Sequence, residues 1–216
     1  MPDFSFECAC SGVVCGIDEV GRGPWAGPVV AAAVILDRDR LPASLSAAID
    51  DSKLLTRARR EAIFAELPAY ACIGLGSADV AEIERLNIYW ATMLAMQRAA
   101  AALVCPPDIA LVDGKGTPAL PCPVRCIVDG DALSLSIAAA SIAAKVTRDR
   151  LMIDMAVEFP DYGFERHVGY GTREHRAALI RLGPTPHHRL GFPSVQGILA
   201  QLALDLPVAA APAAGP

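Results

Sequence analysis

Residues 13–36 read VVCGIDEVGRGPWAGPVVAAAVIL, and this stretch indicates the class of fold. Positions 13–17 and 28–36 are apolar runs rich in β-branched residues, which predicts two strands. The loop 21–27 joins them, and its glycines permit backbone conformations that other residues avoid. Because the acids Asp18 and Glu19 follow the first run directly, the stretch predicts a strand that carries carboxylates at its end.

On the C-terminal side of this stretch, short apolar runs alternate with segments of helical composition. Further strands are expected at 70–75, 108–113 and 124–128, and helices at 56–67, 87–103, 136–158 and 173–182. Asp79 and Glu82 have the spacing of a capping box for another short helix, and Asn87 is expected to cap the helix after it. Strands with interleaved helices, followed by helices alone, predict an α/β domain with a helical C-terminal extension.

Acidic residues stand at the ends of several expected strands. Asp18 and Glu19 close the first, Asp113 closes the fourth, and Asp131 follows the fifth. Burying such carboxylates is costly unless a cation neutralises them, and Mg²⁺ and Mn²⁺ prefer oxygen ligands. Two such ions about 4 Å apart can clamp the attacking and leaving oxygens of a phosphodiester. One Asp-Gly pair alone would be ordinary turn chemistry, but the set predicts a metal site, with Asp129 competing for the fourth position.

The pair Asp18 and Glu19 poses a geometric problem, because successive side chains of a strand face opposite sides. Both reach one site only if the chain leaves the sheet there, which Gly21 and Gly23 would permit. Arg22 adds a cation between the glycines, and exposed N–H groups of such a loop can meet an anion. We therefore expect a sugar-phosphate to approach the backbone at this loop.

The composition indicates one ordinary folded domain. The 216 residues are 53% hydrophobic and 20% charged, with a formal net charge of −5, which weakly disfavours non-specific coating of nucleic acid. No apolar run reaches the ~18 residues of a membrane span, and the N-terminus does not resemble a secretory signal, so a cytoplasmic protein is expected. The seven cysteines lack C-x-x-C spacing, which favours free thiols.

Motifs along nearly the whole chain resemble those of bacterial ribonuclease HII, the type 2 ribonuclease H. In chain order they are GIDEVGRGP at 16–24 with AGP at 26–28, DSK at 51–53, NI at 87–88 with ATM at 91–93, VDG at 112–114, GD at 130–131, AASIAAKVTRD at 139–149, YGF at 162–164 and GY at 169–170. So long an ordered series does not arise by chance.

The resemblance implies a ribonuclease H-like fold, a mixed β-sheet flanked by helices, and a metal-dependent endoribonuclease. It assigns metal binding and catalysis to Asp18, Glu19, Asp113 and Asp131, with two Mn²⁺ or Mg²⁺ ions in the active complex and Asp18 bridging them. The implied substrates are RNA–DNA hybrids and single ribonucleotides embedded in duplex DNA. Cleavage on the 5′ side of the ribonucleotide would leave 3′-hydroxyl and 5′-phosphate ends.

The same resemblance implies how the substrate is recognised. The backbone of Gly21, Arg22 and Gly23 would contact the ribose 2′-hydroxyl, the group by which proteins tell RNA from DNA. Tyr170 would stack on the deoxyribose that follows, so a single RNA-to-DNA junction could suffice.

Other polar residues within the motifs have less certain roles. Lys53, Ser141 and Lys145 are candidates for phosphate contacts, with a solvated face or helix packing as the alternative. Asp149 is expected to pair with Arg148 or Arg150 outside the metal ligands. All four histidines lie between 167 and 188, in a stretch (141–190) with more basic than acidic residues, which is the better candidate for a polyanion-facing surface. Their spacing forms no metal triad, so surface or loop roles are expected.

The chain departs from the family pattern at a few positions, none of them a carboxylate of the metal set. Leu54 and Val168 stand where basic residues are common, Ala138 where a serine is usual, and Asp129 is an extra acid. These differences bear on substrate affinity and its salt dependence.

Three regions and two alternative functions complete the expectations. Residues 1–12 would form an N-terminal arm, 13–206 the catalytic domain with its helical part from about 160, and 207–216 a disordered Ala/Pro tail. Monomer is the default, without a membrane partner. One alternative is a related nuclease, ribonuclease HIII or a resolvase, although no extra substrate-binding domain precedes Val13. The other is a hybrid-binding module without catalysis, against which the complete carboxylate set weighs.

Overall fold

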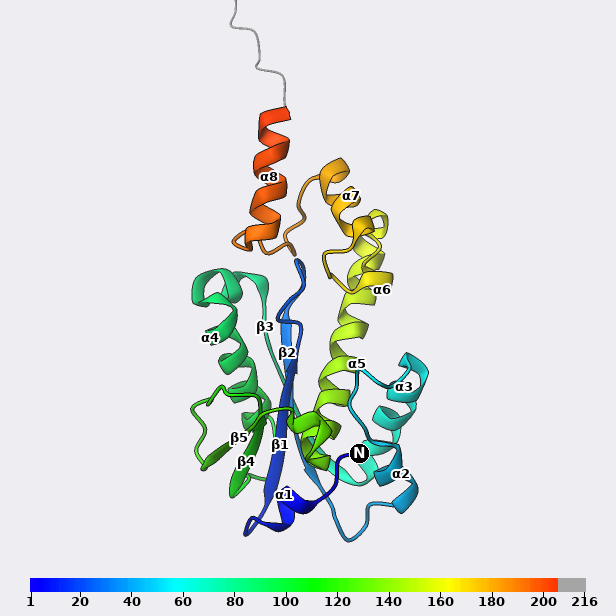
Figure 1. Cartoon of the computed structure of the whole chain (residues 1–216), viewed down its shortest axis with the longest axis vertical. Coiled ribbons are helices and arrows are strands. Elements are labelled where there is room, and N and C mark those ends of the chain that lie inside the picture. Colours follow the sequence, from blue (N-terminus) through cyan, green and yellow to red (C-terminus); the bar gives the residue numbers. More distant parts are fainter. Residues whose placement is uncertain (206–216) are drawn as a thin grey trace, which may run out of the picture.

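A computed structural model describes residues 1–205, and the expected tail at 207–216 lies outside them. A five-stranded sheet lies between helices (Figure 1). The strands are β1 (Val14–Val20), β2 (Val29–Leu36), β3 (Ala71–Ala78), β4 (Ile109–Asp113) and β5 (Val124–Ile127). The helices are α1 (Ser5–Cys8), α2 (Ala43–Ala48), α3 (Arg57–Glu66), α4 (Val80–Ala101), α5 (Leu135–Glu158), α6 (Phe164–His167), α7 (Arg173–Leu182) and α8 (Pro193–Asp205), with 3₁₀ turns η1 (Leu67–Ala69), η2 (Gly130–Ala132) and η3 (Pro160–Tyr162).

The central strand is β1 in the order β3-β2-β1-β4-β5. It runs antiparallel to β2 and parallel to β4, so the sheet is mixed and the expected fold class is confirmed. Pairing with β2 continues as far as Val20, whereas pairing with β4 ends where Ile17 lies opposite Val112. The last part of β1 therefore has a neighbouring strand on one side only.

Helices cover both faces of this sheet (Figure 1). α4 packs on the face that includes Ile17, Val29 and Ala31. α5 and α3 pack on the opposite face, where Ala32 and Val34 are buried. Burial on both faces explains why β2 is apolar at every position instead of alternating with polar residues.

The start of α5 lies against β1 at Gly16. A Cβ atom at Gly16 would stand 2.2 Å from the carbonyl carbon of Ser136, so glycine allows the two backbones to approach. Buried Glu7, from α1, accepts hydrogen bonds from the Ser134 hydroxyl at 2.6 Å and the Ser136 N–H at 2.9 Å. The N-terminal residues thus help to hold the first turn of α5, which places the middle of this helix beside the end of β1.

Two expected helix caps are confirmed within α4. Asp79 and Glu82 form the capping box, and Asn87, with a φ of 67°, interrupts the helix. The Asn87 side-chain oxygen accepts from the N–H groups of Tyr89 and Trp90 at 2.9 and 3.2 Å, so it begins a new helical segment. Among residues 1–205, no helix combines the length and apolar character that a membrane crossing requires.

Four helices, α1, α2, α6 and α8, were not expected from the sequence. α1 and α6 have four residues each, too few to show a helical period. α8 begins at Pro193 and contains Gly197, and both residue types weaken a helix prediction. Together with α7, which has the expected bounds, α8 forms a C-terminal part beyond the end of the sheet (Figure 1).

Candidate active site

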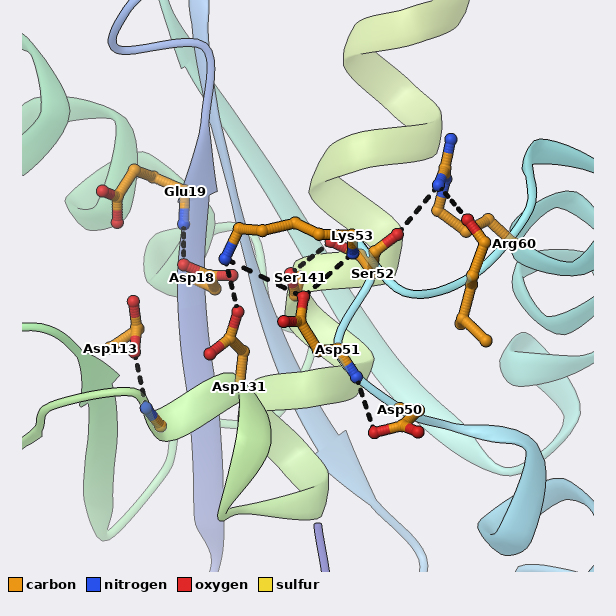
Figure 2. Close-up of polar contacts among 12 residues, drawn as sticks. Asp18, Glu19, Asp50, Asp51, Ser52, Lys53, Arg60, Asp113, Asp131 and Ser141 are labelled. Atoms are coloured by element: carbon orange, nitrogen blue, oxygen red, sulfur yellow. Dashed lines mark hydrogen bonds and ion pairs between the residues drawn. The ribbon is translucent and has the colours of Figure 1, made fainter. Parts of the chain in front are cut away.

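Four carboxylates surround the open end of β1 (Figure 2). Asp18 and Glu19 lie in β1, Asp113 is the last residue of β4, and Asp131 lies in η2 just before α5. Asp129 occupies an exposed turn in the left-handed conformation. Of the two candidates for the fourth position, the structure therefore places Asp131 beside the other acids.

The expectation that the chain leaves the sheet at the acid pair is wrong. Asp18 and Glu19 remain paired with β2, opposite Ala32 and Ala31. The site opens because β4 ends at Asp113, which removes the neighbour on the other side of β1. The freed N–H of Glu19 donates to the Asp18 carboxylate at 2.7 Å. Because β4 is shorter than β1, the end of β1 is open on one side, and no twist of the chain out of the sheet is needed.

Crowding and burial disfavour the charged forms of these carboxylates. Only 5% of Asp18 is exposed, and burial, followed by repulsion from Glu19 and Asp113, raises its pKa well above the usual range. Burial also raises the pKa of Glu19, although Arg22 at 3.3 Å opposes the shift. The pKa of Asp113 is raised by burial and by Asp131. The buried carboxylates repel one another, and a bound cation would reduce this repulsion.

Lys53 supplies one positive charge to this cluster. Its Nζ donates to Asp131 at 2.8 Å and lies near Asp51 at 3.8 Å (Figure 2). The side chain is 75% exposed, so it can move away at little cost. The hydrogen bond to Asp131 raises the pKa of Lys53.

The carboxylates fit a divalent metal by donor chemistry. Mg²⁺ and Mn²⁺ prefer hard oxygen ligands, and the acids described above supply only these. Within residues 1–205, however, no three His, Cys, Asp or Glu side chains are grouped closely enough to hold an ion as they stand. Mg²⁺ can also be bound by one or two carboxylates while water completes its coordination.

The site opens into a cavity of about 310 Å³. It is lined by Asp18, Glu19, Val20, Gly21, Arg22, Gly23, Ser52, Lys53, Asp113, Ser141, Lys145 and Tyr170. Every expected site residue except Asp131 is among them. Gly21 has a φ of 96°, and the Tyr170 ring, 43% exposed, lies 3.9 Å from the position of a Cβ on Gly23. The loop and the tyrosine therefore face the same space as the carboxylates.

Several side chains around the cavity have partners that sequence reasoning missed. The Ser141 hydroxyl lies 2.8 Å from that of Ser52, and its hydrogen bond to Asp18 lowers that residue's pKa. Lys145 donates to Asp149 at 2.6 Å. Asp149 also lies 3.7 Å from Arg60, so the expected pairing with Arg148 or Arg150 is wrong.

The expectation of surface or loop roles is wrong for His167 and His175, which are buried in α6 and α7 with 7% and 0% exposed. His188 lies in the loop between α7 and α8, but it is also buried, with 1% exposed. The fully buried Arg148 and Arg189 lie close to them.

Comparison with known proteins identifies the family. The sequence model of the Ribonuclease HII family matches residues 15–195. The chain belongs to the ribonuclease HII family. Among the relatives, ribonuclease HII of Paramagnetospirillum magneticum is 59% identical over 195 residues, which cover 90% of this chain and 97% of the relative. The protein is thus a metal-dependent endoribonuclease that acts on nucleic acid, and the resemblance seen in its motifs is confirmed.

Solved structures share the ribonuclease HII fold. Ribonuclease H2 from Pyrococcus horikoshii OT3 aligns with a TM-score of 0.73 at 24% identity, covering 88% of this chain and 98% of that one. Bst-RNase HIII in complex with Mn²⁺ aligns with a TM-score of 0.69 at 21% identity, covering 89% and 70%. At these identities the likeness shows the fold alone.

Proposed function

We propose that this protein hydrolyses the RNA strand of RNA–DNA hybrids and also cuts on the 5′ side of single ribonucleotides embedded in duplex DNA. One observation carries the proposal. Three of the carboxylates, Asp18, Glu19 and Asp113, line the same cavity as the loop Gly21–Gly23 and Tyr170. One cavity can therefore hold a scissile phosphate, the ribose beside it and the next sugar.

The carboxylates Asp18, Glu19, Asp113 and Asp131 would hold the metal, with Mn²⁺ or Mg²⁺ as the candidates and two ions in the active complex. When bound, the ions would activate water and stabilise the leaving oxygen of the phosphodiester. Asp18, which interacts with both Glu19 and Asp113, would be the central residue of this set. Lys53 would release Asp131 and become available to a phosphate oxygen. The Mn²⁺ seen in Bst-RNase HIII supports this choice of ion.

Recognition of the ribose falls to the loop. Gly21 and Gly23 carry no side chain, so a sugar can approach the backbone N–H groups closely. These groups would hydrogen-bond the 2′-hydroxyl, and the exposed ring of Tyr170 would pack on a following sugar without one. Lys145 and Ser141, on α5, are the further candidates for phosphate contacts, while Arg22 adds positive charge at the cavity rim.

A cleavage assay tests this proposal. The protein is incubated with Mn²⁺ or Mg²⁺ and three duplexes: an RNA–DNA hybrid, DNA with one ribonucleotide, and DNA alone. We expect cutting of the first two, immediately 5′ to the ribonucleotide in the second, with 3′-hydroxyl and 5′-phosphate ends, and none with EDTA. Tight binding of the first two without cutting would instead support a hybrid-binding module. Cutting of the all-DNA duplex would contradict recognition of the 2′-hydroxyl.

The proposed working form is a cytoplasmic monomer. All residues of the site come from one chain, so a second copy is not needed to complete it. The catalytic unit would comprise residues 13–206, with 1–12 as an arm against it. Light scattering at the concentration of the assay should give the mass of one chain, 22.7 kDa.

A further inference from the structure

Two buried arginines lie behind the loop that faces the cavity. Arg148, on α5, and Arg189, just before α8, are both 0% exposed. Within residues 1–205, neither has a carboxylate within 4 Å. A buried guanidinium without a carboxylate is expensive unless its donors meet other acceptors. Backbone carbonyl groups are the acceptors here.

Arg189 binds the loop from the inside. Its Nη1 donates to the carbonyl of Arg22 at 3.0 Å, and its Nη2 donates to that of Gly21 at 2.6 Å. Both Nε and Nη2 donate to Gly27, at 3.0 and 2.7 Å. The guanidinium also lies over the ring of Phe192, with 5.1 Å from Cζ to the centroid. Both ends of the loop 21–27 are thus hydrogen-bonded to the planar guanidinium of Arg189.

These hydrogen bonds orient the N–H groups of the loop. The described peptide bonds are all trans, so each N–H points away from the carbonyl of the same peptide unit. Because the carbonyls of Gly21 and Arg22 face Arg189, the N–H groups of Arg22 and Gly23 point away from it. This arrangement leaves those donors free for a ligand on the other side of the loop.

Arg148 ties the loop to the segment that carries Tyr170. Its Nε and Nη2 donate to the carbonyls of Pro28 and Ala26 at 2.9 and 3.1 Å. Its Nη1 donates to the carbonyl of Val168, two residues before Tyr170, at 2.9 Å. The planar guanidinium of Arg148 therefore links residues 26–28 to the segment that carries Tyr170.

The loop 21–27 and the segment that carries Tyr170 are closely packed against each other. A Cβ on Gly21 would stand 2.2 Å from Arg148 Nε, and a Cβ on Gly169 would stand 2.5 Å from the carbonyl oxygen of Ala26. The Trp25 N–H also donates to the carbonyl of Gly169 at 2.8 Å. Burial lowers the pKa of Arg148 to about 10 and that of Arg189 to about 9, so both keep all their donors at neutral pH.

We propose that Arg148 and Arg189 are positioning residues that set the distance between the loop Gly21–Gly23 and Tyr170. This inference rests on the proposed function, in which the loop contacts a ribose and the tyrosine contacts the next sugar. A single embedded ribonucleotide needs both contacts at the correct spacing. In a continuous RNA strand every nucleotide carries a 2′-hydroxyl. Cleavage of such a strand should therefore depend less on the distance between the loop Gly21–Gly23 and Tyr170. The two arginines would therefore determine the preference for an RNA–DNA junction without touching the substrate.

The test compares Arg148→Lys with the wild type on two substrates. Lysine keeps the charge but cannot reach three carbonyls with one ammonium group. We expect kcat/KM for the single-ribonucleotide duplex to fall roughly tenfold more than kcat/KM for the continuous hybrid, because small misplacements of a bound substrate are costly. Arg189→Lys should show the same selectivity. KM and kcat are measured separately, below the melting temperature of each variant.

Met96→Ala is the matched control, because Met96 is buried in the core under α4 and touches neither segment. It should lower the melting temperature and leave the ratio between the substrates unchanged. If Arg148→Lys does not fold, Gly169→Ala replaces it. That variant pushes the two segments apart with both arginines in place, and the same selective loss is expected.

Equal losses on both substrates, or an unchanged ratio, would overturn the inference. Failure of the proposed function itself is distinguishable, since the wild type would then leave the single-ribonucleotide duplex uncut.

Discussion

At the scale of single residues, the site combines acids that repel one another with a lysine that partly compensates them. Asp18 is the most constrained of these acids, because it is buried between Glu19 and Asp113. Its raised pKa means that the charged carboxylate is less favourable in the folded protein than in the unfolded chain. The stability of the apo-protein is therefore reduced by the group on which the proposed chemistry depends.

Replacing this carboxylate should separate activity from stability. We predict that Asp18→Asn lowers cleavage by roughly a thousandfold or more, since it removes a ligand of the reaction centre. The same change should raise the free energy of unfolding of the metal-free protein by roughly 0.5–2 kcal/mol, the usual range for a stabilising substitution. Thermal unfolding with and without Mn²⁺ measures the second effect. The ion should raise the melting temperature of the wild type more than that of the variant.

Near-normal turnover by Asp18→Asn would show that the acids have been assigned wrongly. If the metal-free Asp18→Asn variant were less stable than the wild type, the buried carboxylate of Asp18 would not be destabilising the fold.

At the scale of elements, the site depends on where strands and helices stop and how closely they approach. β4 ends before β1 does, which opens the sheet at the acids. α5 crosses β1 at Gly16 and carries Ser141 toward Asp18. The interruption of α4 at Asn87 is a third such feature.

We predict that Gly16→Ala destabilises the protein by about 2 kcal/mol or more, because backbone atoms of α5 would have to move. Gly197→Ala is the matched control: a Cβ there meets no atom within 4 Å, and alanine favours the helix α8. The control should be stabilised by roughly 0.5–1 kcal/mol. Urea unfolding of both variants measures the difference, and equal effects would contradict the close approach of α5 to β1.

We also predict that Asn87→Ala costs about 1–2 kcal/mol, because it removes the helix cap and leaves a non-glycine residue at positive φ. Asn87→Gly should cost less, since glycine adopts that φ without strain. Circular dichroism during thermal unfolding compares the two variants. A glycine variant less stable than the alanine variant would contradict this account of Asn87.

At the scale of the whole molecule, a series of buried hydrogen bonds links the C-terminal part to Tyr170 at the cavity. The Thr185 N–H donates to His188 Nδ1 at 2.9 Å, and the Nε2 atoms of His188 and His175 lie 3.0 Å apart. His175 Nδ1 lies 2.9 Å from the carbonyl oxygen of Tyr170 and must carry the proton of that hydrogen bond. Each ring is therefore neutral, and a second proton on either would place two donors face to face.

These hydrogen bonds between neutral histidines should make the folded protein less stable in acid. Burial, followed by repulsion from neighbouring histidines, lowers the pKa of His175 and of His188 from 6.5 to about 4, although hydrogen bonds to the backbone oppose the shift. The unfolded chain then binds protons that the folded protein does not, so stability is complete above about pH 6.5 and is lost as the pH falls toward 4. We expect a loss on the order of 2 kcal/mol between pH 7 and 4.5.

Urea unfolding at several pH values tests this expectation. His175→Gln should flatten the profile in that window, while His187→Gln, at a half-buried position outside the chain of hydrogen bonds, should leave its slope unchanged. An identical slope in His175→Gln and the wild type would refute the assignment.

The sequence by itself determined the strands and most of the long helices, and it predicted the candidate site residues. Apolar periodicity, caps and acids at strand ends are local features, so they can be read without the fold. Only the tertiary structure decided that β4 stops short of β1, that Lys53 holds Asp131, that Arg148 and Arg189 bind the loop 21–27, and that Arg148 also binds Val168 before Tyr170. These contacts join residues up to 168 positions apart. The backbone carbonyls that satisfy the arginines leave no trace in residue type, so the loop Gly21–Gly23 was visible in the sequence but its support was not.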